Sequence, residues 1–115
     1  MDIKKNHPML SQQAIEAIVR RIVSAAHAPS KVIIFGSYAR GNARQDSDLD
    51  VLVVEREILD LGEEILRLNA AAGRLPVDID ILVYAEEEFE KRKDWCSTPV
   101  YWATREGKVL YEYHQ

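Results

Sequence analysis

Apolar positions in the first half of the chain follow two periods, which predict one helix and then two strands. From Ser11 to about residue 27, apolar side chains recur at helical spacing, with Ser11 at the N-cap position and Pro29 beyond the end. Residues 31–35 are apolar after Lys31, as in a central strand that is covered by helices on one side and partly buried on the other. Residues 48–54 form a second expected strand, which opens with two carboxylates and continues as an apolar run.

The second half of the chain continues this alternation. Apolar spacing predicts a helix from Ile58 to Ala72 that ends at Gly73. The further expected elements are a strand at 77–84, a helix at 86–95, a short helix at 100–105 capped by Thr98, and an edge strand at 109–111. We therefore expect an α/β fold with a mixed sheet of about three to four strands packed by helices.

Length and charge indicate one folded domain. The 115 residues are 47% hydrophobic, which is enough for a single core, so we expect one domain over residues 1–115. The net charge of -4 argues against extensive nucleic-acid binding, which relies on clustered Lys and Arg. No apolar run could span a membrane, and the N-terminus lacks a signal-peptide apolar region. Cys96 is the single cysteine, so no internal disulfide can form, and we expect a cytoplasmic location.

The candidate chemistry lies between the first two strands. Gly36 permits a tight turn and close approach of a ligand, and Ser37 adds a hydroxyl and an N–H group where a helix can begin and bind phosphate. Asp48 and Asp50 are two residues apart, so on a strand their side chains lie on one face. Neighbouring carboxylates repel each other unless a cation lies between them or one is protonated. The pattern indicates a phosphate site beside a divalent metal site.

The Gly36-Ser37 pair, ten intervening residues and Asp48-Leu49-Asp50 resemble the signature of the DNA polymerase β-type nucleotidyltransferase superfamily. The sequence of this segment is similar to the minimal nucleotidyltransferase (MNT) branch in particular, and the resemblance covers about residues 30–112. The resemblance implies transfer of a nucleoside monophosphate from a nucleoside triphosphate, ATP by analogy, to a hydroxyl, with release of pyrophosphate. It implies two Mg²⁺ ions as cofactors, held by Asp48 and Asp50, and phosphates held by Gly36 and Ser37.

A third carboxylate from a downstream strand completes the metal site in the superfamily. Asp78 and Asp80 are the candidates, and both would project from one face of the third strand. We favour Asp80, because the sequence from Asp80 to Phe89 looks like the family's catalytic strand running into its next helix. The alternative is that these are ordinary polar residues on an exposed sheet face, although aspartates are unfavourable in strands.

Other polar and aromatic residues have two interpretations each. Arg40 and Arg44 follow the turn at helix-like spacing, and either would pair with a triphosphate or make a surface ion pair with Asp46. Ser47 would cap the turn before Asp48. Trp102 is expected to pack in the core or face a partner, with nucleobase stacking as the weaker interpretation.

The resemblance also bears on the acceptor. Minimal nucleotidyltransferases with this sequence pattern are commonly antitoxins paired with a HEPN-domain ribonuclease toxin, and some adenylylate a tyrosine of that toxin. The leading hypothesis is therefore a Mg²⁺-dependent adenylyltransferase that uses ATP and acts on such a tyrosine. The alternatives are a partner-binding antitoxin module with weak or no turnover, and a nucleotidyltransferase that modifies a small molecule such as an aminoglycoside.

Overall fold

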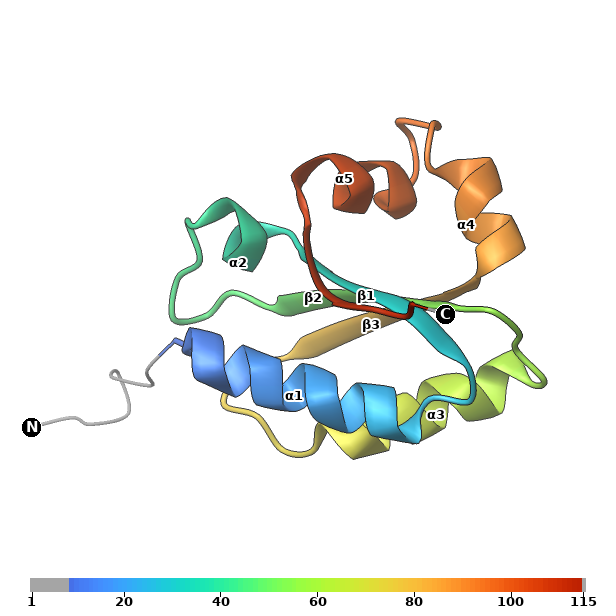
Figure 1. Ribbon diagram of the computed structural model, residues 1–115. Helices are drawn as coiled ribbons and strands as arrows, with labels where there is room; N and C mark the ends of the chain where they lie inside the picture. Colours follow the sequence, from blue (N-terminus) through green and yellow to red (C-terminus); the bar gives the residue numbers. More distant parts are fainter. Residues whose placement is uncertain (1–8, 115) are drawn as a thin grey trace, which may run out of the picture.

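Four strands form one mixed sheet in the computed structural model, which describes residues 9–114 (Figure 1). Their order is β3-β2-β1-β4, with bounds β1 (Pro29–Phe35), β2 (Leu49–Glu55), β3 (Ile79–Ala85) and β4 (Lys108–Glu112). Strand β1 pairs antiparallel with both β2 and β4, whereas β2 and β3 are parallel. The expected α/β fold with a small mixed sheet is confirmed.

Helices cover both faces of this sheet, as Figure 1 shows. Helices α1 (Gln12–Ala25) and α3 (Leu61–Ala72) lie on one face, and α4 (Glu86–Arg92) and α5 (Pro99–Glu106) lie on the other. Each face buries its own apolar cluster. The α1/α3 side buries Ile15, Ile18, Val19, Ile22, Val32, Ile34, Leu49, Val51, Val53, Leu68, Ala72, Ile81 and Val83. The α4/α5 side buries Ile33, Leu52, Val54, Phe89, Val100 and Ala103.

Side-chain caps set where the helices begin. Ser11 Oγ accepts a hydrogen bond from the Ala14 N–H at 3.0 Å, and the Thr98 side chain accepts one from the Tyr101 N–H at 3.3 Å, as expected for N-caps. Helix α3 begins at Leu61 and not at residue 58, because Asp60 Oδ1 accepts a hydrogen bond from the Glu63 N–H at 3.0 Å and caps it there.

Two further element boundaries differ from those expected. Helix α4 ends at Arg92 and not near residue 95, because the Thr98 hydroxyl lies within hydrogen-bonding distance of both the Arg92 and Trp95 carbonyls and holds the chain in a turn. Strand β3 begins at Ile79, two residues later than expected. No helix within residues 9–114 is long and apolar enough to cross a membrane.

Strand alternation places the sheet's carboxylates on one face. Leu49, Val51 and Val53 belong to the cluster under α1 and α3, so the residues between them face α4 and α5. Asp50 therefore lies on the α4/α5 side of β2. By the same alternation, Asp80 lies on that side of β3, because Ile81 and Val83 are buried on the other.

Candidate active site

The strand register brings Asp50 and Asp80 side by side. Phe35, the last residue of β1, is paired with Asp50, and Asp50 is paired with Asp80 in the parallel neighbour. Adjacent strands lie about 4.8 Å apart. The row of paired residues across three strands therefore consists of Phe35, Asp50 and Asp80 and carries two carboxylates. Gly36 follows directly after Phe35.

Asp48 and Asp78 occupy different positions from those expected. Both lie just before a strand, because β2 begins at Leu49 and β3 begins at Ile79. The Asp78 carbonyl accepts a hydrogen bond from the Leu49 N–H at 2.9 Å, so the main chain of Asp78 extends the β2–β3 pairing. Only Asp80 lies within β3, whereas Asp78 comes directly before it, and the expectation that both project from one strand face stays a prediction.

The surroundings of Asp50 disfavour its negative charge. Burial raises the pKa of the Asp50 carboxyl, and the negative charges of Asp80 and Asp48 raise it further, against the opposing charge of Arg40. Asp78 is not among the groups that shift it. Asp48 and Asp80 thus both act electrostatically on the Asp50 carboxyl.

Gly36 brings the main chain against this group. Its φ of +73° and ψ of -154° lie in a region that is essentially restricted to glycine. A Cβ at this position would lie 2.2 Å from Asp50 Oδ2, so no other residue fits without moving that carboxylate. The glycine predicted from the sequence is therefore required both by the turn and by the position of Asp50.

The helix after the turn is only one turn long. Helix α2 (Ser37–Arg40) ends at Gly41, whose φ of +83° is left-handed. Arg44 therefore lies beyond the helix and not on one face of it with Arg40. The Arg44 N–H donates to Ser47 Oγ at 2.8 Å, which confirms that Ser47 caps the turn before Asp48.

Arg40 has a partner that the sequence did not suggest. Its Nη1 lies 3.5 Å from Glu106 Oε1, at the end of α5, and both side chains are about half exposed. The sequence had offered Asp46 as the partner, and no Arg40–Asp46 pair occurs among the ion pairs of the described chain. The contact joins the end of α2 to the end of α5, two elements far apart in the sequence.

A cleft of about 430 Å³ connects these features. Its volume lies within the usual range of small-molecule sites, about 300–1,000 Å³. The β1–α2 turn and the start of β2 form one wall and α5 forms the other. The lining residues are Phe35, Gly36, Ser37, Arg40, Ser47, Asp48, Asp50, Pro99, Trp102 and Glu106. The sequence identified the first wall, whereas the contribution of α5 depends on packing that no local motif reports. Arg44 and Asp80 are not among the lining residues.

The donor set of this cleft suits a magnesium ion. Within residues 9–114, no three His, Cys, Asp or Glu side chains are gathered closely enough to hold a metal by themselves. Mg²⁺ rarely needs such a cage, since one or two carboxylates, waters and substrate phosphates usually complete its octahedral shell. Coupled carboxylates beside a turn open to phosphate provide the hard oxygen donors that Mg²⁺ prefers.

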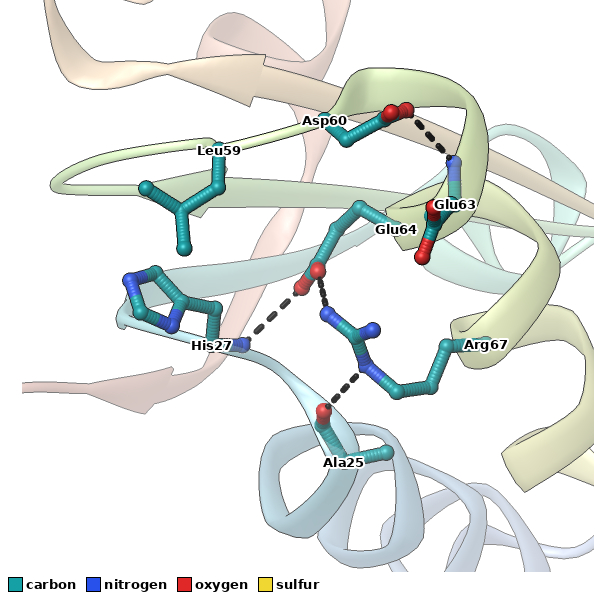
Figure 2. Close-up of a pocket in the computed structure, with 7 residues that line it drawn as sticks. All are labelled: Ala25, His27, Leu59, Asp60, Glu63, Glu64 and Arg67. Carbon is teal, nitrogen blue, oxygen red and sulfur yellow. Dashed lines mark hydrogen bonds and ion pairs between the residues drawn. The ribbon is translucent and has the colours of Figure 1, made fainter.

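A second cleft, of about 380 Å³, lies beside the start of β1, at the end of that strand opposite Gly36 (Figure 2). There the buried carboxylate of Glu64 accepts a hydrogen bond from the His27 N–H at 2.9 Å and pairs with Arg67, whose Nε donates to the Ala25 carbonyl at 3.0 Å. These contacts fasten α3 to the end of α1. The charged groups at the centre of this cleft are thus engaged in holding the fold together.

Comparisons with known proteins agree with this geometry. A family model described as a nucleotidyltransferase domain matches residues 15–71, so the match includes most of α1, which the sequence resemblance had left out. A Methanocaldococcus jannaschii protein named "Putative protein adenylyltransferase MJ0604" is 32% identical over 108 residues, covering 90% of this chain and 100% of that protein.

Solved structures share the fold. A toxin-antitoxin structure with AMP-PNP superposes with a TM-score of 0.59 and 21% identity, covering 89% of this chain and 75% of that one. A complex of tri-AMPylated Shewanella oneidensis HEPN toxin with MNT antitoxin superposes with a TM-score of 0.58 and 19% identity, covering 89% and 72%.

Proposed function

Because the chain belongs to the nucleotidyltransferase domain family, we propose that it is a Mg²⁺-dependent adenylyltransferase that transfers AMP from ATP to a tyrosine of a HEPN-type partner protein. The observation that carries the chemistry is the pairing of Asp50 with Asp80 in one strand row, directly beside the Gly36 turn. Asp50 of that row lines a cleft of about 430 Å³, a volume in the usual range of small-molecule sites.

Each residue of the cleft has a separate task in this proposal. The main chain of Gly36 and the hydroxyl of Ser37 bind the β- and γ-phosphates, and Arg40 adds a guanidinium on the same side. Arg44 lies outside the cleft lining, so its predicted contact with the nucleotide is the weakest of the set. Helix α2 is too short to contribute much dipole, so the N–H groups and the arginine act at short range.

The carboxylates serve the transfer step. Asp48 and Asp50 would hold Mg²⁺, and Asp80 would complete the set of carboxylates from β3. When bound, Mg²⁺ neutralises charge on the triphosphate and lowers the pKa of the attacking hydroxyl. The acceptor oxygen forms a bond to the α-phosphorus while the bond to the β-phosphate oxygen breaks, and pyrophosphate leaves with that electron pair. Asp80 lies on β3, an edge strand of the sheet, so an incoming acceptor can transfer its hydroxyl proton to the Asp80 carboxylate.

The acceptor is inferred from the relatives and not from the cleft. The M. jannaschii relative is named as a protein adenylyltransferase, and the S. oneidensis structure contains a tri-AMPylated HEPN toxin with an MNT antitoxin. Tyrosine offers a hydroxyl on a long side chain that can reach a shallow site from a partner's surface. These observations favour a protein acceptor over an aminoglycoside-like small molecule.

Transfer can be tested directly with ATP labelled at the α-phosphate, Mg²⁺ and a HEPN-domain protein from the same genome. We expect label on the partner and an added AMP on a tyrosine by peptide mass spectrometry. Asp50→Asn should reduce the rate by at least about 100-fold. Asp46→Asn, an exposed carboxylate outside the cleft lining, is the matched control. Tight binding of the partner without any transfer would contradict the proposal.

A further inference from the structure

We propose that the indole of Trp102 is the surface on which the nucleobase of the bound nucleotide stacks, an assignment that rests on the proposed function of the cleft. Trp102 lines the same cleft as Ser37, Arg40 and Asp50 but comes from the opposite wall, α5. The ligand chemistry concerned is a planar aromatic base attached to a phosphate chain.

The helix face around Trp102 explains why its indole is available. Val100 and Ala103 are buried at 0% and 1% exposure and attach α5 to the sheet, whereas Trp102 retains 47% exposure. Glu106, one turn later on the same side of the helix, reaches Arg40 across the cleft. The phosphate-binding wall and the indole therefore face the same space.

The indole is also held in a fixed orientation. Its Nε1–H donates to the Cys96 carbonyl at 3.0 Å, and the Tyr101 ring packs against it edge to face, with centroids 5.0 Å apart and an interplanar angle of 83°. Because the N–H group is already satisfied, the exposed part of Trp102 offers a ring surface and no free polar group. A fixed aromatic ring loses little conformational entropy when a base stacks on it.

The rest of the cleft makes this surface distinctive. Ser37, Arg40, Ser47, Asp48 and Asp50 supply polar and charged groups, so they suit phosphate and metal and not a base. Trp102 is the large aromatic group on the α5 wall. The acceptor, by contrast, is expected at β3, and β2 lies between β3 and β1, the strand on which α5 packs. Stacking accepts any base, so Trp102 supplies affinity and little selectivity.

Fluorescence can test this contact, because Trp95 and Trp102 are the chain's two tryptophans. Trp95→Phe leaves Trp102 as the single indole. With Mg²⁺ present, we expect ATP to quench its emission and tripolyphosphate, which lacks a base, to bind by competition without comparable quenching. Trp102→Ala should weaken ATP binding by about 5- to 100-fold, the usual range for one stacked base. Trp102→Phe should retain most of the affinity, and Trp95→Ala is the matched control.

The outcomes separate this inference from the function beneath it. Unchanged tripolyphosphate affinity in Trp102→Ala, together with weaker ATP binding, supports stacking and shows that the variant is folded. Unchanged ATP affinity in that variant overturns the stacking while leaving the transferase intact, and a loss confined to the KM of the acceptor assigns the indole to the acceptor instead. If wild-type protein binds neither ATP nor tripolyphosphate, both the proposed function and this inference fail.

Discussion

Replacing Gly36 by alanine tests whether the turn and Asp50 work as one unit. The added Cβ would lie 2.2 Å from Asp50 Oδ2 and 3.1 Å from Asp50 Cγ. Ordinary contacts begin near 3.4 Å, so the carboxylate oxygen has to retreat by about 1 Å. A carboxylate can do this by rotating its side chain, which leaves the fold intact but moves Asp50 away from its position beside Asp80.

The substitution should change both the stability of the protein and the rate of AMP transfer. The backbone at Gly36, with a φ of +73° and a ψ of -154°, costs a residue with a Cβ about 1–3 kcal/mol. For a chain of this size, that lowers the Tm by roughly 4–12 °C. A misplacement of about 1 Å at a reacting centre costs on the order of 100-fold in rate. The variant should therefore be folded and nearly inactive.

Gly41→Ala is the matched control, because Gly41 has a φ of +83° but no atom within 4 Å of the position that a Cβ would take. Its strain of about 1–2 kcal/mol should lower the Tm by a similar amount. Thermal melts and initial rates of AMP transfer on both variants make the comparison. If the two proteins melt alike and transfer AMP at similar rates, the contact between Gly36 and Asp50 has no part in catalysis and the reasoning is refuted.

Three other changes give distinct readouts. Because the folded protein raises the pKa of Asp50, the contribution of this group to stability is complete below its ordinary pKa of 3.8 and is lost as the pH rises through the folded pKa. Without metal, Asp50→Asn should therefore have a higher Tm than wild type at pH 7, and the difference should disappear as the pH falls below 3.8. Equal Tm values at pH 7 would contradict this. Glu106→Gln removes the ion pair of Arg40, so the affinity for tripolyphosphate, measured by calorimetry, should increase by up to about 5-fold. The free energy of unfolding should change by less than about 1 kcal/mol. Weaker tripolyphosphate binding would disprove competition between Glu106 and phosphate for Arg40. Arg67→Ala leaves the buried Glu64 carboxylate with fewer partners, so the free energy of unfolding measured in urea should fall by about 1–3 kcal/mol. The rate of AMP transfer should not change. An unchanged urea midpoint would show that the Glu64–Arg67 pair does not contribute to stability.

The parts of the site that depend on local sequence could be predicted. The local geometry of Gly36 and of the Asp48-Leu49-Asp50 segment follows from the residue types themselves. A left-handed φ favours glycine, and strand alternation places Asp50 on the opposite face from its apolar neighbours. The helix caps Ser11 and Thr98 were equally local. Each of these features is fixed by residues within a few positions of it.

The parts that depend on packing could not. The contact between Arg40 and Glu106, and the place of Trp102 in the cleft, arise because α5 packs on β1 next to the turn. Whether Asp78 lies within the third strand depended on the strand boundary, and β3 begins two residues later than expected. The burial of Glu64 depended on its contacts with Arg67 on the same helix and with the His27 N–H, which lies after the end of α1.

The most direct measurement of the central claim compares Asp80→Asn with Asp78→Asn in single-turnover AMP transfer from ATP with saturating Mg²⁺. Each substitution removes one exposed negative charge, and the two positions are two residues apart, but only Asp80 is paired with Asp50 across the sheet. We predict that Asp80→Asn slows transfer by about 100-fold or more and that Asp78→Asn stays within about threefold of wild type. Near-normal transfer by Asp80→Asn, or an equal loss in both variants, would contradict the assignment of the third carboxylate.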